Sequence, residues 1–386
     1  MNPSAELLKE SWTLVEGRKD KVTALFYARL FLSHPDMRQM FPLQLQTREP
    51  AMLHAIVGAA LSIDSAQHDD VHLAELGRQH RKYEARPEHY DAVGASLVEA
   101  MRAVAGEQWL SEYDGAWLEA YAAVARTMLD GAAKDPVPAV WPAMVVDHER
   151  RGRDVAVFTC LPNQPLHFRA GQHVSLECRQ HPKLWRTYSV ANAPREDRLL
   201  EFHVRAHDAG MVSGALVRRL RPGDEVRLAT PAGSMTVDRR SMRDIVCVAG
   251  GTGLAPIKAL VQDLGRFNRS RWVHVFFGAR DRDDLYDLPA LLALAARYPW
   301  LSIVPACSDD PTYQGERGLI SDVVARYGPW DRHDFFLAGP APMLRATLHT
   351  LAELRIPSIR INYDRAALDL PGGYARWELA PRRIAC

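Results

Sequence analysis

The hydrophobic pattern changes twice along the chain and predicts a multidomain fold: an all-α domain, then an antiparallel β-barrel, then an α/β domain with a parallel sheet. Up to about residue 134, apolar residues recur at helical spacing. Short alternating runs follow, separated by turn signals such as Arg221-Pro222-Gly223-Asp224, a pattern typical of a small barrel. From Asp244 onward, apolar runs typical of buried strands alternate with helical segments. The length of 386 residues also suits about two to three domains.

These changes set the boundaries of the three predicted domains. Leu7, Leu8, Trp12 and Val15 illustrate the helical spacing of the first domain. The segment DPVPAVWP at 135–142 cannot continue a helix because its prolines lack the backbone N–H group, so it predicts a linker. We therefore expect a first domain at 1–135, a second at 136–238 and a third at 239–386.

The composition is that of a globular protein with balanced charge. It is 47% hydrophobic and 25% charged, and 48 basic against 47 acidic residues give a net charge of +1. This balance favours no nucleic acid partner. No apolar stretch approaches the ~20 residues of a membrane span, and the first residues lack the pattern of a secretion signal. We expect a cytoplasmic protein that is a monomer or a weak dimer.

The cysteines give no sign of a disulfide framework or an iron–sulfur cluster. They are scattered and odd in number, and no two of them form a CxxC pair, which indicates reduced thiols. The five positions are Cys160, Cys178, Cys247, Cys307 and Cys386.

One histidine of the helical domain is a candidate iron ligand. Leu73, Leu76 and His80 fall on the same face of a predicted helix. A histidine that faces an apolar slot near a helix end can ligate an iron whose porphyrin fills that slot. Most of the 15 histidines are expected to be surface or ordinary core residues, and spacing alone leaves three competitors: His54, His72 and His89.

Two motifs of the barrel region suit a flavin nucleotide. In Arg186-Thr187-Tyr188-Ser189, an arginine can hold a phosphate, a tyrosine can lie on a flat ring and a serine can bond the polar edge of that ring. Downstream, Gly210-Met211-Val212-Ser213-Gly214 opens a short helix whose N-terminus can take a second phosphate. Each motif alone is common, so their order and combination carry the interpretation.

The strongest single motif is Ala249-Gly250-Gly251-Thr252-Gly253-Leu254-Ala255-Pro256, which follows a buried strand and opens a helix. Glycines at such a turn let the backbone approach a pyrophosphate, and the helix N-terminus offers N–H groups and partial positive charge. A later strand ends in Leu337-Ala338-Gly339-Pro340-Ala341-Pro342-Met343 and also enters a helix. We expect both strand ends to face one crevice at the carboxyl edge of the sheet.

In type, order and spacing, these motifs resemble the ferredoxin–NADP reductase-like superfamily from about Pro142 to Ile361. The resemblance implies FAD in the barrel, with Tyr188 against the isoalloxazine, Ser189 near the hydride-accepting nitrogen and Arg186 on the pyrophosphate. It also implies NAD(P)H in the α/β domain. The residues it assigns to the coenzyme are Gly250, Gly251, Thr252, Gly253, Pro256, Gly339, Pro340 and Met343, and to FAD also Thr187, Gly210, Val212 and Ser213. Ala338 replaces the usual cysteine that helps to place the nicotinamide, so we expect slower hydride transfer.

The helical domain resembles the globin of bacterial flavohaemoglobins in TALFYARLF at 23–31, in His34-Pro35 with Met40-Phe41-Pro42, and from Leu76 to Tyr90. A globin ahead of a flavin reductase is that family's architecture, and the resemblance covers nearly the whole chain. It implies haem b, with His80 as the proximal iron ligand and Tyr27 as the distal hydroxyl donor. It also implies that Phe41 packs on the haem and that Tyr90 supports His80.

The haem pocket departs from the family pattern on both sides. The distal position that usually holds a glutamine aligns with Arg48, with Gln44 and Gln46 close by. The expected proximal glutamate falls near Ala132, with Asp130 the nearest carboxylate. Such a carboxylate strengthens a histidine ligand, so its loss predicts weaker electron donation to the iron.

The C-terminal region also departs from the pattern. Ala366 stands near the place of the aromatic residue that normally covers the flavin, and Tyr363 is the nearest substitute. The tail to Cys386 is longer than the family pattern predicts, and we assign it no role. The chain is therefore expected to be a flavohaemoglobin, and these departures from the family pattern indicate a divergent member.

The resemblance implies that electrons pass from NAD(P)H through FAD to haem iron and that nitric oxide and O2 become nitrate, the activity of a nitric oxide dioxygenase. A first alternative is a divergent flavohaemoglobin that uses another electron donor or acceptor, which the departures favour. A second is an oxygen- or redox-sensing haem protein. The sequence does not decide whether NADH or NADPH is the preferred coenzyme. The arginines of segment 278–282 could bind the 2′-phosphate of NADPH, but an arginine at a strand end is common.

Overall fold

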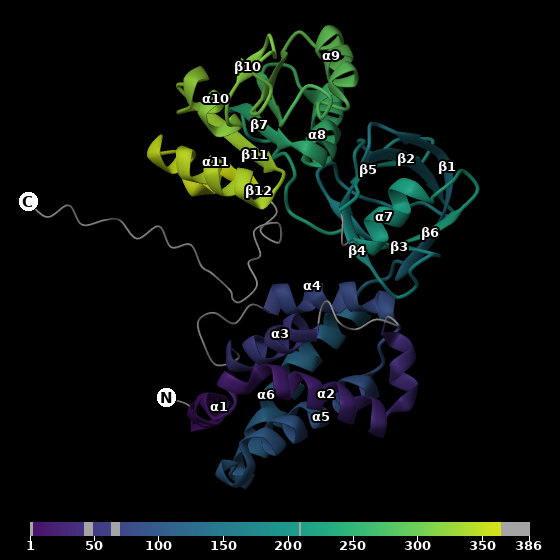
Figure 1. Cartoon of the computed structure of the whole chain (residues 1–386), viewed down its shortest axis with the longest axis vertical. Coiled ribbons are helices and arrows are strands. Elements are labelled where there is room, and N and C mark those ends of the chain that lie inside the picture. Colours follow the sequence, from purple (N-terminus) through teal and green to yellow (C-terminus); the bar gives the residue numbers. More distant parts are fainter. Residues whose placement is uncertain (1–2, 42–48, 63–69, 208–209, 364–386) are drawn as a thin grey trace, which may run out of the picture. The chain divides into compact units, whose positions relative to one another are not determined.

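The computed structural model describes residues 3–41, 49–62, 70–207 and 210–363. The chain divides into two compact units. The first holds Glu84–Asp135 and the described residues up to His80, and the second holds Arg81–Tyr83 and the described residues from Pro136 to 363. Helices make up the first unit, and two sheets with their helices make up the second (Figure 1). The predicted order of all-α, antiparallel β and α/β segments is confirmed, and the boundaries 1–135, 136–238 and 239–386 stay a prediction.

The first unit is built from α-helices joined by short 3-10 turns. Its core holds large, fully buried side chains, among them Phe26, Leu53 and Trp117. Pro87 occupies the first turn of a helix, where its missing N–H group costs no hydrogen bond. Gly106 ends that helix with a φ of +65°, a conformation that glycine adopts without strain. The helices are α1 (Pro3–Thr13), α2 (Lys19–Ser33), α3 (Glu49–Ser62), α4 (Asp70–His80), α5 (Pro87–Ala105) and α6 (Ser111–Ala133).

Helices α4 and α6 pack with their backbones in close contact. A Cβ atom at Gly77 would overlap the carbonyl group of Met128, and one at Gly131 would overlap the backbone of Ala74. Only glycine fits at either position. This close approach fixes the end of α4, where His80 lies.

The barrel of the second unit is a six-stranded sheet in the order β4-β3-β6-β1-β2-β5, with every pair antiparallel. A bridge between Val190, which follows β4, and Phe202 on β5 links the two edge strands. Phe158, Phe202 and Leu228 fill the interior, and α7 (Met211–Arg218) packs against it. The strands are β1 (Val140–Arg150), β2 (Val155–Pro162), β3 (His173–Cys178), β4 (Arg186–Ser189), β5 (Leu200–Arg205) and β6 (Glu225–Ala229).

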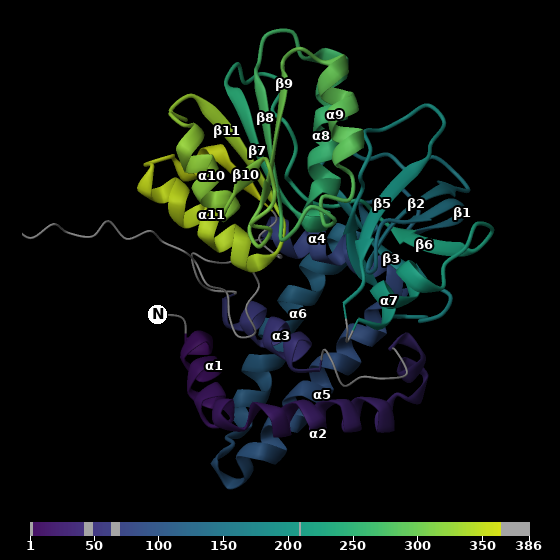
Figure 2. The same ribbon diagram turned by 45° about the horizontal axis from the view of Figure 1, so that its top comes forward.

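The second sheet of this unit is parallel, in the order β10-β9-β8-β7-β11-β12. Successive residues of β7 face opposite sides: Cys247 packs with α8 and α9, and Val248 packs with α10 and α11. Figure 2 shows β7, β8 and β9 between these two helix pairs. The elements are β7 (Asp244–Gly250), α8 (Leu254–Phe267), β8 (Val273–Ala279), α9 (Leu288–Arg297), β9 (Leu301–Cys307), β10 (Glu316–Arg317), α10 (Ile320–Tyr327), β11 (His333–Ala338), α11 (Ala341–Glu353) and β12 (Ile361–Tyr363).

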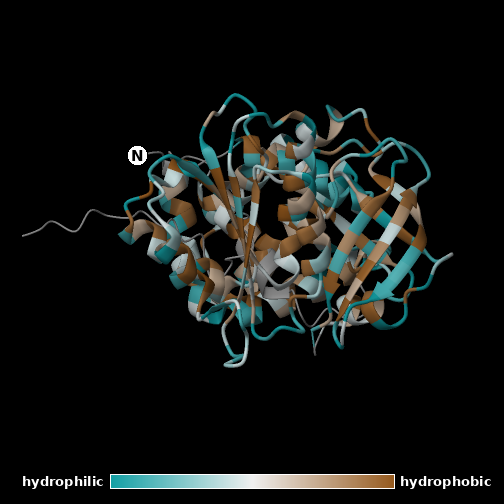
Figure 3. Cartoon of the chain, turned by 90° about the horizontal axis from the view of Figure 1, so that it is seen from above, coloured by the Kyte–Doolittle hydropathy of each residue, from teal (hydrophilic) through white to brown (hydrophobic). Residues whose placement is uncertain are grey.

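The difference between the sheets explains their sequence patterns. The barrel has one face towards its interior and one towards solvent, so hydrophobic and hydrophilic segments alternate along its strands (Figure 3). Helices cover both faces of the parallel sheet, so β7 is buried from Ile245 to Gly250.

Candidate functional site

His80 lies at the last position of α4, and its ring is held by the backbone. Its Nδ1 lies 2.8 Å from the carbonyl oxygen of Leu76, one helical turn earlier. Because a carbonyl only accepts hydrogen bonds, Nδ1 carries the proton, and in the neutral ring Nε2 then carries the lone pair. This is the form of imidazole that binds iron, so the residue fits the proximal role.

A cluster of apolar and aromatic side chains packs along α4. Leu73, Tyr90, Tyr121, Val124, Ala125 and Met128 are buried together, with Leu76 packed against them. Burial raises the pKa of Tyr90, and burial together with Tyr90 and Asp91 raises the pKa of Tyr121 above its ordinary range. Both phenols therefore stay neutral hydrogen-bond donors. Tyr90 is thus a buried member of this cluster, and its role as a partner of His80 stays a prediction.

The structure brings Tyr27 and Phe41 together in the first unit. Tyr27 on α2 is 7% exposed, and its ring centroid lies 5.8 Å from Phe31 and 5.9 Å from Phe41. Phe31 and Phe41 are 5.2 Å apart in an edge-to-face arrangement. The Tyr27 ring is packed between Phe31 and Phe41, and its hydroxyl suits the predicted role of hydrogen-bond donor to a ligand on the distal side of a haem. The candidates Arg48, Gln44 and Gln46 lie outside the described residues.

The competing histidines have other surroundings. His89 occupies the first turn of α5, where its Nδ1 accepts a hydrogen bond of 3.1 Å from the backbone N–H of Arg86. It therefore caps a helix. His72 is exposed on α4, and the side chain of His54 lies outside the described residues. Asp130, the nearest carboxylate to the expected proximal glutamate, is exposed on α6.

The four residues Arg186 to Ser189 form β4, which pairs with β3 at one edge of the barrel. Burial is the main cause that raises the pKa of Tyr188, which packs against the barrel core. Burial and the positive charges of Arg219 and Arg186 lower the pKa of His181 nearby. A neutral tyrosine and two guanidinium groups at this edge fit a flavin ring and its phosphates.

The first turn of α7 is compact and starts at Gly210. The Ser213 hydroxyl donates to the Gly210 carbonyl at 3.3 Å and accepts from the His207 backbone N–H at 3.3 Å. A Cβ at Gly210 would overlap the Ser213 hydroxyl, so a larger residue there requires that hydroxyl to move. Val212 and Ser213 are buried, and the helix N-terminus fits a phosphate group.

The two glycine turns of the parallel sheet meet. A Cβ at Gly250 would overlap the Met343 sulfur, and one at Gly253 would overlap the Ala338 carbonyl. Strands β7 and β11 are neighbours, while β8 lies on the other side of β7. The chain thus reverses direction across the sheet between β7 and β11, which is where open sheets of this kind bind nucleotides. This geometry agrees with the crevice that the sequence predicts, and it fits a dinucleotide.

Sequence reasoning missed a buried ionic network between β5 and the α/β elements. Alternation along β5 puts Glu201, His203 and Arg205 on one face. The Lys258 amino group, on α8, lies 2.7 Å from the Asp287 carboxylate and 3.0 Å from that of Glu201. Lys258 and Asp287 are 8% and 2% exposed. Polar residues at alternate positions of β5 were the only sequence signal.

His203 connects this network to a buried tyrosine. Its Nε2 lies 2.8 Å from the Glu201 carboxylate, and its Nδ1 lies 2.7 Å from the Tyr286 hydroxyl. Burial lowers the pKa of His203, so the ring is neutral: it donates to Glu201 and accepts from Tyr286. Burial alone would raise the pKa of Glu201, but the hydrogen bond from His203 and the charge and hydrogen bond of Lys258 lower it to about 2.

Three family models match the chain. The Globin family matches residues 24–128, the Oxidoreductase FAD-binding domain matches residues 142–237, and the Oxidoreductase NAD-binding domain matches residues 247–349. Together they follow the helical unit, the barrel and the parallel sheet in order.

Two kinds of curated relatives are similar to the chain. The flavohemoprotein of Halalkalibacterium halodurans is 25% identical over 394 residues, covering 93% of this chain and 95% of that one. The electron transfer component XylA of a Pseudomonas putida xylene/toluene monooxygenase is 32% identical over 233 residues, covering 59% of this chain. The chain spans 66% of that component's length, and 56% of the length of the phenol 2-monooxygenase reductase component DmpP.

Among solved structures, the flavohemoglobin of Malassezia yamatoensis with bound FAD and heme has a TM-score of 0.79. It is 18% identical and is matched over 94% of this chain and 98% of that one, which shows the shared fold. In the part of the chain that the structure describes, no helix is both long and apolar enough to cross a membrane.

Proposed function

This chain belongs to the flavohaemoglobin family and is an oxidoreductase with globin, FAD-binding and NAD-binding parts, and we propose that it is an NAD(P)H-dependent nitric oxide dioxygenase. When bound, NAD(P)H supplies two electrons as a hydride, FAD passes them on singly, and haem b supplies the iron at which O2 reacts. Two nitric oxide and two O2 molecules then give two nitrate ions for each NAD(P)H oxidised, with release of one proton.

One observation supports this proposal: His80, with its Nδ1 held by a backbone carbonyl, lies in a helical unit that precedes matches to an FAD-binding and an NAD-binding oxidoreductase domain. The Leu76 carbonyl holds the His80 ring so that Nε2 is the ligating nitrogen. The close contact between Gly77 and Met128 fixes the helix that carries it. We assign His80 as the haem ligand, with Tyr90 in the cluster beside α4.

Tyr27 is proposed to stabilise negative charge that develops on oxygen. Its hydroxyl is carried by a buried ring among Phe26, Phe31 and Phe41. Where apolar rings exclude water, a hydrogen-bond donor acts more strongly on such charge than it does in water. Phe41 is proposed to pack on the haem in the same pocket.

In the second unit, we assign flavin binding to β4 and to the N-terminus of α7, and coenzyme binding to the glycine turns that follow β7 and β11. Arg186 binds a flavin phosphate, while Tyr188 and Ser189 orient the flavin ring from β4. The α7 N-terminus binds a second phosphate. The turns at Gly250–Gly253 and at Gly339–Pro340 hold the coenzyme between β7 and β11.

The test uses the purified full-length chain. We expect visible bands of haem and flavin, and nitric oxide consumed at catalytic rates with nitrate formed when O2 and NAD(P)H are present. His80→Ala is expected to lose the haem band and the activity. His72→Ala, an exposed histidine on the same helix, is the matched control and should keep both. Haem and turnover that persist in His80→Ala would overturn the assignment.

A second candidate is an oxidoreductase of this family that passes electrons to another acceptor. It is favoured by the higher identity to reductase components of oxygenases, 32% and 34%, than to flavohemoproteins, 25% to 27%. Coenzyme-dependent reduction of ferricyanide without consumption of nitric oxide would select it. We further propose that the protein works in the cytoplasm as a monomer or weak dimer, with three domains at 1–135, 136–238 and 239–386.

A further inference from the structure

The loops after β8 and β9 lie side by side at the carboxyl edge of the parallel sheet. The Ser308 N–H donates to the Ala279 carbonyl at 3.0 Å, and the Asp309 N–H donates to the Arg280 carbonyl at 2.8 Å. These bonds continue the β8–β9 pairing beyond the strand ends. The two loops therefore form one continuous surface next to the strand that leads into the glycine turn.

This surface is where the adenosine end of a dinucleotide is expected. The order β9-β8-β7-β11-β12 places β8 beside the first strand, whose glycine turn takes the pyrophosphate. In sheets of this order, the end of the second strand meets the ribose: an acidic side chain accepts a hydrogen bond from the 2′-hydroxyl, and an arginine accommodates a 2′-phosphate.

The charges at this surface are mostly negative. The two loop segments 280–284 and 308–312 carry Arg280 and Arg282 together with five aspartates, so two positive and five negative charges give −3 for these segments. The aspartates are Asp281, Asp283, Asp284, Asp309 and Asp310.

Arg282 is held by a neighbouring loop residue. Its Nε donates to the Asp310 carboxylate at 3.0 Å, and its Nη2 donates to the Thr312 hydroxyl at 2.8 Å. Asp310 in turn accepts from the Thr312 backbone N–H at 2.9 Å and from its hydroxyl at 2.6 Å. These hydrogen bonds from Thr312 and Arg282 lower the pKa of Asp310 to about 2, so the carboxylate stays ionised. The guanidinium is therefore engaged in an ion pair.

A second arginine near the turn is also neutralised. Arg205 from β5 lies near Gly251 and forms ion pairs with Asp284 at 2.7 Å and with Asp154 at 3.1 Å. Asp281 fixes this loop by accepting the backbone N–H groups of Asp283 and Asp284, each at 3.0 Å. Acidic groups thus compensate both Arg282 and Arg205.

We propose that this surface selects NADH over NADPH, with Asp310 as the specificity-determining residue because it holds Arg282 in an ion pair. A 2′-phosphate carries about −1.5 to −2 charges at pH 7 and is repelled by the surplus of carboxylates. A 2′-hydroxyl is a neutral donor that a carboxylate accepts. The inference rests on the proposed function in one respect, since it assumes a nicotinamide dinucleotide as the hydride donor.

The experiment measures dissociation constants of NAD+ and NADP+ for the full-length protein by calorimetry, without turnover. We expect NAD+ to bind at least ~10-fold more tightly, since a site built for one 2′ group leaves charges or donors unpaired with the other. Asp310→Asn is expected to tighten NADP+ roughly 5-fold through the released Arg282, with NAD+ changed less than 2-fold. Adding Arg282→Ala should cancel that gain. Asp331→Asn, an exposed carboxylate before β11, is the control and should change neither constant.

The outcomes separate this inference from the proposed function. Tighter binding of NADP+ than of NAD+ by the unchanged protein would overturn the selectivity. Unaltered NADP+ binding in Asp310→Asn, in a variant with the same melting temperature, would overturn the role of Asp310. A protein that binds NAD+ selectively and consumes no nitric oxide would overturn the dioxygenase and leave the selectivity standing. A protein that binds neither nucleotide would overturn both.

Discussion

The Lys258 amino group on α8 lies 2.7 Å from the Asp287 carboxylate, and both side chains are almost completely buried. Glu201 on β5 completes the contact at 3.0 Å, so one lysine ties the barrel to the parallel sheet. The α8 helix that carries Lys258 is also the helix that begins at the glycine turn. The network therefore holds β5 of the barrel against α8 and the residue that precedes α9.

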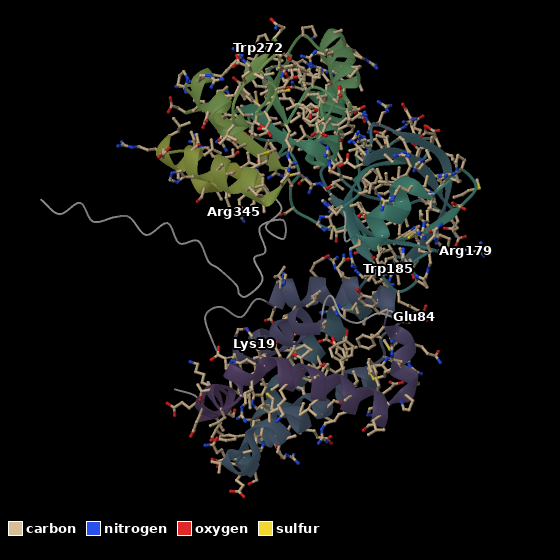
Figure 4. The ribbon with its side chains drawn as sticks, viewed as in Figure 1. Lys19, Glu84, Arg179, Trp185, Trp272 and Arg345 are labelled. Atoms are coloured by element: carbon tan, nitrogen blue, oxygen red, sulfur yellow. The ribbon has the colours of Figure 1, made fainter. Side chains whose placement is uncertain are left out.

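Replacing Lys258 should destabilise the second unit. Lys258→Met removes the nearest cation of the buried Asp287, which keeps only Arg151 at 3.4 Å, and removes the ion pair of the partly buried Glu201. This loss is expected to cost about 3 kcal/mol of the free energy of unfolding. Denaturant unfolding measures this loss. Arg345→Met is the control, because Arg345 is exposed on α11 (Figure 4) and its loss should cost less than about 0.5 kcal/mol. Equal effects of the two changes would contradict the network's role.

Stability should fall as the pH drops below about 6.5. Burial lowers the pKa of His203, so the unfolded chain takes up a proton that the folded chain refuses, and the free energy of unfolding decreases from the unfolded pKa downwards. His181, His274 and His333 also have lowered pKa values and add to this slope. His203→Gln is expected to reduce the slope by up to ~1.4 kcal/mol per pH unit between pH 6.5 and 5. An unchanged slope in urea titrations would mean that His203 is protonated in the folded protein.

A further loss is expected at lower pH. The pKa of Glu201 is lowered to about 2, so its stabilising effect is complete above the ordinary carboxyl value and is lost as the pH falls from about 4.5 towards 2. Glu201→Gln should flatten this part of the curve. The same unfolding series, extended to low pH, measures it.

The contact between α4 and α6 should tolerate no methyl group. Gly77→Ala places its Cβ against the Met128 carbonyl and must separate the helices, at an expected cost of about 2–3 kcal/mol. Because α4 carries His80, the fraction of protein that retains haem should fall as well. Gly115→Ala on α6 is the matched control: no atom lies within 4 Å of its Cβ, so it should stabilise by about 0.5–1 kcal/mol. Thermal unfolding and the Soret absorbance report the two effects, and full haem retention in Gly77→Ala would refute the link.

Tyr27→Phe tests the distal donor without disturbing the packing of the rings. The hydroxyl is lost while the contacts with Phe31 and Phe41 remain, so the protein should fold normally. Loss of a donor worth about 1–3 kcal/mol predicts O2 dissociation that is faster by about 5-fold to 150-fold. Flash photolysis or stopped-flow mixing measures the rate. Tyr298→Phe, in the second unit, should leave it unchanged.

The sequence could predict the features that depend on local periodicity and local turns. The change from helical to alternating to buried-strand patterns gave the order of the folds, and the glycines at 250–253 and 339 marked the nucleotide edge. The sequence could not pair residues that are distant in the chain. Glu201, Lys258 and Asp287 lie on three different elements, and only the fold brings them together.

The same limit applies to side-chain roles. His80 and His89 both lie near helix ends, and the sequence could not tell that His89 accepts a bond from the Arg86 backbone as part of a helix cap. Likewise, the sequence predicts Arg282 as a possible phosphate ligand, but in the structure its guanidinium forms an ion pair with Asp310 of another loop. In both cases the deciding partner is a hydrogen bond that residue spacing does not reveal.

Because Gly250 and Met343 are in contact, the residue that fits at one of these positions depends on the residue at the other. The methionine sulfur occupies the volume that any larger residue at position 250 would need, although 93 positions separate the two in the chain. A larger residue at position 250 therefore requires the Met343 side chain to move. Enlarging position 250 calls for a smaller residue at 343 in the same clone, so redesign of this coenzyme pocket should randomise the two codons jointly.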